Sequence, residues 1–254
     1  MMMVLFALFL GCSGGGQTEF EAGVTASRSG DQVTAIQSFV EALEAGGQDT
    51  SVYHGLGNAL YREGRKAEAV AAWRRGLALD PTNGDIAANL DQVRKTFKDR
   101  LDPPAAHRGA FFWQSVLSPL EAAIGGSVGL SIGCWLMVLG RVRKLRGGDG
   151  LSSNEKWLGF VSAALGLILA ISTVDVLQQR EGAVVIVDEV DVRSALGPAG
   201  VSLFVLHQGA EVTVADSTDT HQLVVLSDGR KGWINTDTLL STDPASPFLV
   251  VHGS

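Results

Sequence analysis

The stretch that decides the first part of the fold is "YHGLGNALYREGRKAEAVAAWRRGLALDP", residues 53–81. An earlier stretch, "FEAGVTASRSGDQVTAIQSFVEALEAG" at residues 20–46, aligns with it at a shift of 34 residues (23 to 57, 30 to 64). The shift superposes Gly23 on Gly57, Gly30 on Gly64, Ala35 on Ala69 and Phe39 on Trp73. Small residues let two helices approach closely, and the aromatic residue fills the space toward the next helix pair. The pattern predicts stacked pairs of helices.

This period and these residues resemble the tetratricopeptide repeat family, whose repeat is 34 residues long. We expect an all-α solenoid over residues 16–101, with repeats at 16–49 and 50–83 and a capping helix at 84–101. The second repeat matches the pattern well and ends at Pro81, whereas the first lacks a terminal proline. The resemblance implies a concave peptide groove lined by Phe20, Val24, His54, Asn58, Tyr61 and Gln92. Ordinary surface and inter-repeat packing is the alternative interpretation of these six residues.

Two apolar stretches without charged residues follow, at 122–140 and 157–174. Because a helix of about 20 residues crosses the hydrocarbon core of a bilayer, they predict a two-helix transmembrane hairpin. The glycine content of the first stretch leaves a packed pair of soluble helices as the alternative. The connecting segment 141–156 is basic, and its topology determinants are Arg141, Arg143, Lys144 and Arg146. The positive-inside rule places this loop in the cytoplasm and both flanking segments on the outer side of the membrane.

The chain begins with "MMMVLFALFLGCSGGG", an apolar run that is too short to span a bilayer. Residues 1–15 are typical of a signal peptide, and "LFLGC" resembles a bacterial lipoprotein signal in which Cys12 is the lipidation candidate. The run departs from that pattern because no Lys or Arg precedes it and Phe9 stands where leucine is preferred. Ordinary cleavage, an uncleaved anchor and a misassigned start remain alternatives.

The pattern changes after the second apolar stretch to short β-branched runs separated by turn signals such as "GPAG" and "SDGR". Residues 183–242 resemble the bacterial SH3-like fold, which implies a small all-β barrel. The strand "HQLVVL" departs from that family because it lacks the usual tryptophan. With few aromatic residues present, a groove for proline-rich peptides is disfavoured. Trp233 is expected in the core rather than on a ligand platform.

The order of these parts resembles the BatE family, encoded in bacterial aerotolerance operons, and predicts a multidomain envelope protein. The resemblance also rests on the junctions "DPTNGDIAANLDQVRKTF" (80–97) and "VDVRSALGPAGVSLFVLHQGAEVTV" (190–214). It implies a non-enzymatic protein of the bacterial inner membrane with both soluble domains on the periplasmic side. The partners that it implies are von Willebrand factor A-type and other Bat proteins, together with a MoxR-type ATPase system. Membrane lipid is a further expected partner. Peptidoglycan binding through the SH3-like domain is the alternative function.

Composition and motifs exclude other classes of function. The formal net charge is -7 and the dense basic cluster lies between the two apolar stretches, so nucleic acid is not an expected partner. No HExxH or CxxC motif occurs, and no glycine-rich loop follows a strand and opens a helix. The histidines lie one per segment, at His54, His107, His207, His221 and His252. We therefore expect no catalytic residues, no metal site and no cofactor.

Overall fold

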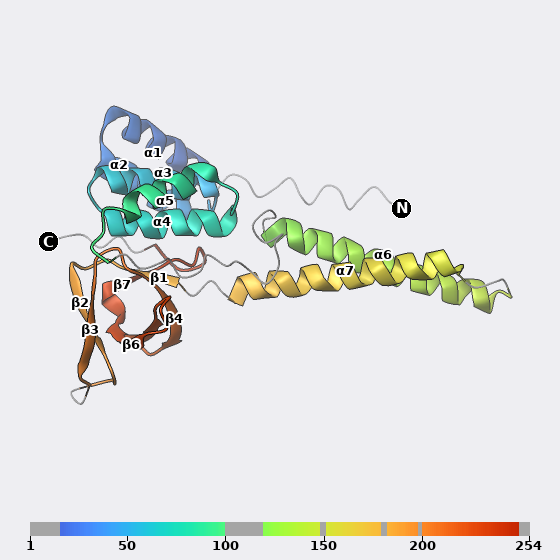
Figure 1. The fold of residues 1–254 in the computed structure, drawn as a ribbon. Helices are drawn as coiled ribbons and strands as arrows, with labels where there is room; N and C mark the ends of the chain where they lie inside the picture. Colours follow the sequence, from blue (N-terminus) through green and yellow to red (C-terminus); the bar gives the residue numbers. More distant parts are fainter. Residues whose placement is uncertain (1–15, 100–118, 148–150, 179–181, 198–199, 249–254) are drawn as a thin grey trace. The chain divides into compact units, whose positions relative to one another are not determined.

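The chain folds into two compact units, one of which is assembled from two separate parts of the sequence. The computed structural model describes residues 16–99, 119–147, 151–178, 182–197 and 200–248 (Figure 1). The larger unit combines Met1–Ala106 with Glu181–Ser254, and the smaller unit is His107–Arg180. The intervening unit is therefore an insertion between two parts that fold together.

The first part is a stack of five helices. They are α1 (Gln17–Ser29), α2 (Gln32–Glu44), α3 (Thr50–Arg62), α4 (Lys66–Leu79) and α5 (Gly84–Arg94). Side chains cap three of them at the N-terminus: Asp31 accepts from the Thr34 N–H, Asp49 from that of Ser51, and Asn83 from that of Ile86. Helix α5 ends at Arg94, so it is shorter than the capping helix expected at 84–101.

Glycines explain the 34-residue period. Gly30 and Gly64 have positive φ values of 89° and 86°, a backbone conformation that other residues rarely adopt, and each turns the chain between paired helices. A Cβ atom at Gly57 would lie 2.4 Å from Nε1 of Trp73, and one at Gly23 would lie 2.8 Å from the Phe39 ring. Each aromatic ring thus lies directly against a glycine of the preceding helix.

The second part is an antiparallel sheet of seven strands. They are β1 (Gly182–Val185), β2 (Glu189–Arg193), β3 (Ser202–His207), β4 (Glu211–Ser217), β5 (His221–Val225), β6 (Lys231–Asn235) and β7 (Leu239–Ser241). Their order is β3-β2-β6-β5-β4-β1-β7, so the sheet is open, with β3 and β7 at its edges. The all-β character expected from the sequence is present, but the sheet does not close among the described residues, so the small SH3-like barrel is not shown.

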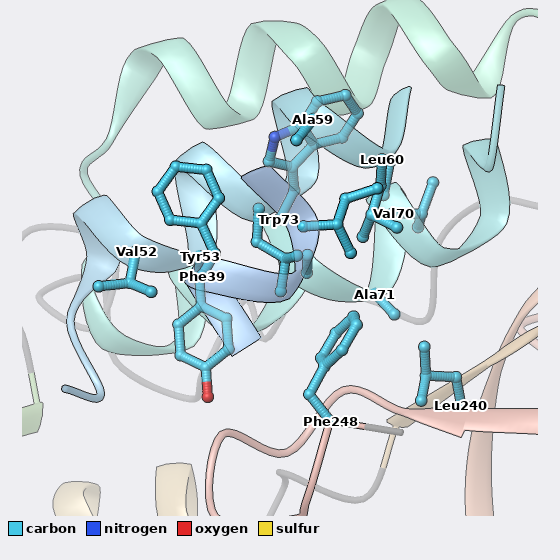
Figure 2. Packing of buried hydrophobic residues seen from close by; sticks show 14 of the residues in the cluster. Phe39, Val52, Tyr53, Ala59, Leu60, Val70, Ala71, Trp73, Leu240 and Phe248 are labelled. Atoms are coloured by element: carbon cyan, nitrogen blue, oxygen red, sulfur yellow. The ribbon is translucent and has the colours of Figure 1, made fainter. Parts of the chain in front are cut away.

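Packing on the helices accounts for the open edge at β7. Strand β1 alternates its side chains between two cores: Val184 belongs to the helical core, whereas Ala183 and Val185 belong to the core of the sheet. Leu240 of β7 also packs into the helical core, beside Phe248 (Figure 2). Helix α4 contacts both β1 and β7, and among the described residues no further strand pairs with β7.

A buried charge cluster also joins the helices to the sheet. Glu211, the first residue of β4, is 6% exposed. Its carboxylate accepts from Nε and Nη2 of Arg94 at 2.6 and 3.1 Å, and Oε2 lies 3.1 Å from Nε of Arg74. Burial lowers the pKa of Arg74, and the charge of Glu211 opposes that shift. A single acid thus holds α4 and α5 to the strand.

The inserted unit is a pair of long helices, α6 (Pro119–Leu145) and α7 (Ser153–Gln178), which lie side by side (Figure 1). Both are long and apolar enough to cross a membrane, over Glu121–Leu145 and Ser153–Ile171. Of the most apolar 18 residues, only 22% are buried in α6 and only 11% in α7. The core helix of a soluble protein would be mostly buried. Both helices extend beyond the predicted spans at 122–140 and 157–174, and α6 continues into the basic segment.

Glycines form the contact between α6 and α7. A Cβ atom at Gly129 would lie 2.9 Å from the carbonyl oxygen of Ser162, and one at Gly133 would lie 2.7 Å from Cβ of Ala163. A Cβ atom at Gly166 would lie 2.6 Å from the backbone nitrogen of Leu130. Such close backbone approach is the usual means by which apolar helices associate in lipid.

Candidate functional site

A polar groove lies between helices α3 and α5. It has a volume of about 430 Å³, and its lining residues are His54, Asn58, Tyr61, Arg62, Trp73, Asp85, Ala88, Asn89 and Gln92. His54, Asn58 and Arg62 are four residues apart along α3, so they share one helical face. Asp85, Asn89 and Gln92 share a face of α5 for the same reason. Two helix faces thus supply the polar lining.

Amide side chains connect the two walls of the groove. Nδ2 of Asn89 donates to Oδ1 of Asn58 at 3.1 Å and lies 3.4 Å from Nε2 of His54. All three side chains are half-buried. Within residues 16–99, the side-chain nitrogen of Asn58 and the side-chain oxygen of Asn89 have no further hydrogen-bond partner. One donor group and one acceptor group therefore remain for a ligand.

Aromatic rings line another part of the groove. The Tyr61 ring lies 5.8 Å from that of Trp73, tilted by 40°. Trp73 is 2% exposed, and its indole N–H has no hydrogen-bond partner among the described residues. Arg62 is exposed, and its Nη1 donates to Oγ of Ser27 on α1 at 3.0 Å. The groove therefore combines the half-buried Tyr61 ring with neutral amides and the opposite charges of Arg62 and Asp85.

The structure brings together four of the six groove residues expected from the sequence, namely His54, Asn58, Tyr61 and Gln92. Phe20 and Val24 do not line this groove. They are partly buried against the helical core, where the Phe20 ring lies 5.9 Å from that of Phe39. Both lie on α1, which does not contribute to the groove.

Sequence reasoning missed Asn89, the residue that bridges the walls, together with Arg62, Trp73, Asp85 and Ala88. A signal was available for part of this set. Applying the 34-residue shift to α3 places His54 on Ala88 and Asn58 on Gln92. Asp85 and Asn89 each lie three residues before Ala88 and Gln92, so all four share one face of α5.

The remaining candidate residues lie elsewhere. The four topology determinants lie at or just beyond the end of α6, where all of them are exposed: Arg141, Arg143, Lys144 and Arg146. Nη1 of Arg143 lies 3.1 Å from Oε1 of Glu155, at the start of α7. Cys12 lies outside the described residues. Among the described residues, no group of three or more His, Cys, Asp or Glu side chains could hold a metal ion.

Comparison with known proteins identifies the second pair of helices. Residues 51–83 match the tetratricopeptide repeat family. The chain is 31% identical over 88 residues to small glutamine-rich tetratricopeptide repeat-containing protein 2 of Mycosarcoma maydis, a match that covers 33% of this chain and 25% of that protein. The chain thus spans about a quarter of the length of this curated relative. No solved structure matches the chain. The helices α3 and α4 therefore form a tetratricopeptide repeat, as the sequence predicted.

Proposed function

We propose that this protein is a membrane-anchored, non-enzymatic adaptor of the bacterial cell envelope, whose groove between α3 and α5 binds an extended segment of a partner protein. The observation that carries the proposal is the groove itself, one wall of which, α3, belongs to a tetratricopeptide repeat. Repeats of this kind present concave surfaces for protein–protein interaction. The side-chain amides of Asn58 and Asn89 are suited to hydrogen-bond the backbone of an extended peptide.

Membrane anchoring is supported by the way in which the chain is assembled. Residues 16–99 and 182–248 pack into one unit, although α6 and α7 separate them in the sequence. Both parts must therefore lie on the same side of any membrane, which requires an even number of crossings between them. Two candidate spans meet this requirement. The basic residues between the spans favour a cytoplasmic loop and an outer location for the larger unit.

The proposal extends to the family resemblance. In this proposal the sheet is the SH3-like module of a BatE-type protein. The partners would then be von Willebrand factor A-type proteins, other Bat proteins and a MoxR-type ATPase system. The order of repeats, apolar helices and sheet supports this assignment. Residues 1–15, with Cys12 as the lipidated residue, would add a second membrane attachment.

Site-specific photo-crosslinking in the full-length protein tests the groove. A photoreactive amino acid at Gln92, in the groove, should capture an envelope protein in intact cells. The same amino acid at Gln37, an exposed position on α2, is the matched control. Identical crosslinking patterns at the two positions would contradict a role of the groove in partner binding.

Reporter fusions test the topology. A reporter that is active only outside the cytoplasm should work when it is fused after residue 110 or 250 and fail when it is fused at residue 149. Replacement of Arg141, Arg143, Lys144 and Arg146 together should scramble the orientation. Reporter activity at residue 149 in the unaltered chain would refute the two-span arrangement.

A further inference from the structure

The segment that follows β7 binds the helical repeats without forming a helix or strand. Within residues 242–248, the four residues 243–246 form a tight turn in which the Ser246 N–H donates to the Asp243 carbonyl at 3.1 Å. Asp243 stabilises the turn further, because its Oδ1 accepts from the Ala245 N–H at 3.0 Å. The Asp243 N–H in turn donates to Oγ of Ser241 at 3.1 Å. The turn directs several backbone carbonyls toward α4.

Arg75 of α4 donates to these carbonyls. Its side chain is fully buried, with Nε donating to Ser241 O at 3.0 Å, Nη1 to Ser246 O at 2.7 Å and Nη2 to Pro247 O at 3.2 Å. No carboxylate lies within ion-pair distance of Arg75 among the described residues. Burial accordingly lowers the pKa of Arg75. Three backbone carbonyls thus make the close contacts to the buried charge, and Tyr53 and the carboxylate of Asp243 oppose the lowering of the pKa.

Two further contacts fix the segment on the repeat. The hydroxyl of Tyr53, on α3, donates to Pro244 O at 3.1 Å. Phe248 is 7% exposed and lies in the helical core, and its ring centroid is 4.8 Å from Cζ of Arg75. Figure 2 shows the Phe248 ring pointing toward the helices near Ala71. The segment thus combines one aromatic anchor with backbone carbonyls that accept from repeat side chains.

We propose that the face of α3 and α4 around Arg75 is a second peptide-binding surface, distinct from the groove, and that residues 242–248 of this chain are its ligand. The contacts resemble peptide recognition, because an arginine side chain binds backbone carbonyls and the hydrophobic core of the helices receives one aromatic side chain. Arg75 and Trp73 are two positions apart on α4, so they lie on nearly opposite faces of the helix. The groove and the Arg75 surface can therefore be occupied at the same time.

Supplying the ligand in trans tests the proposal. A full-length chain with a stop codon after Ser241 is purified in detergent, and its thermal unfolding is followed by tryptophan fluorescence. Its Tm should fall by at least about 4 °C, and a synthetic peptide of residues 241–252 should raise it again as the peptide concentration increases. The Phe248→Ala peptide should require at least about 10-fold more for the same effect. Truncated chains that also contain Arg75→Met should not respond.

An unchanged Tm after truncation, an absence of rescue by the peptide, or equal rescue of the Arg75→Met chain would overturn the proposal. Hydrogen exchange in the untruncated chain provides the test if the truncated chain does not fold. Exchange of residues 242–248 should accelerate at least about 10-fold in Arg75→Met and in Phe248→Ala. Pro247→Ala is the matched control, because this exposed side chain is lost while the carbonyl is kept. Equal exchange in all three variants would refute a binding role for Arg75 and Phe248.

Discussion

The charge cluster around Glu211 makes a sharp prediction, because one carboxylate faces two arginines. In Glu211→Gln, the side chain keeps its volume and one acceptor oxygen but loses the charge that compensates Arg74 and Arg94. The side chains of these arginines are only 14% and 24% exposed, so neither is fully rehydrated in the folded state. We therefore expect the variant to lose stability throughout the larger unit.

The magnitude follows from the burial of the three groups. Removal of one partner from a fully buried ion pair costs roughly 3 to 5 kcal/mol. Partial exposure of the arginines, together with the acceptor oxygen that the substituted amide keeps, reduces this cost to about 2 to 3 kcal/mol. For a unit of this size, each kcal/mol shifts the Tm by about 2 to 4 °C. Glu211→Gln should thus lower the Tm by about 4 to 12 °C.

Thermal unfolding of the full-length protein in detergent measures this shift. Glu44→Gln is the matched control, because Glu44 is an exposed residue of α2. The triple variant Arg74→Met, Arg94→Met and Glu211→Met should be more stable than Glu211→Met alone, since no uncompensated charge remains in it. A Tm of Glu211→Gln equal to that of the control, or a triple variant less stable than Glu211→Met, would show that the cluster does not hold the helices to the sheet.

Three other predictions concern the helices. Trp73→Ala should destabilise the larger unit by roughly 3 to 5 kcal/mol, because it empties the space against Gly57, whereas exposed Glu44→Ala should change stability by less than about 0.5 kcal/mol in the same denaturant titration. Gly129→Leu should reduce the yield of disulfide crosslinking between cysteines introduced on the facing sides of α6 and α7, because the added side chain would meet the backbone of α7. The exposed change Val128→Leu should leave that yield unchanged. Hydrogen bonds from the Thr34 side chain and backbone lower the pKa of Asp31 from its ordinary 3.8. The stability that Asp31 contributes is thus present above pH 3.8 and lost as the pH falls through the lowered pKa, and acid titration of Asp31→Asn should lack that loss.

Local patterns account for the parts of the fold that were predictable. The 34-residue period arises because Gly30 and Gly64 adopt positive φ and because Gly57 admits the Trp73 ring. These requirements act between near neighbours in the sequence, so they leave a repeating signal. The β-branched runs and turn signals likewise indicated a β region at residues 183–242, but they contain no information about which edges pair. For that reason the open edge at β7 was not predicted.

The contacts between the helices and the sheet left no such signal. Arg74 and Arg75 belong to "WRRG" on a helix, which looks like an exposed basic pair. Their partners, Glu211 and the carbonyls from Ser241 onward, lie more than 100 residues away in the sequence. Asn89 was missed for a different reason: its residue type does not mark it, and only the 34-residue shift from α3 to α5 indicates that it lies in a wall of the groove.

The shared core links folding to membrane insertion. Val184, Leu240 and Phe248 complete the hydrophobic core of the repeats, yet all three follow α6 and α7 in the chain. The repeats, which are synthesised first, therefore lack part of their core until the sheet reaches the same compartment. If α6 and α7 span the membrane as we propose, the larger unit can be completed only after the second span has crossed. The basic residues at the end of α6 would then determine both the orientation of the hairpin and whether the larger unit folds.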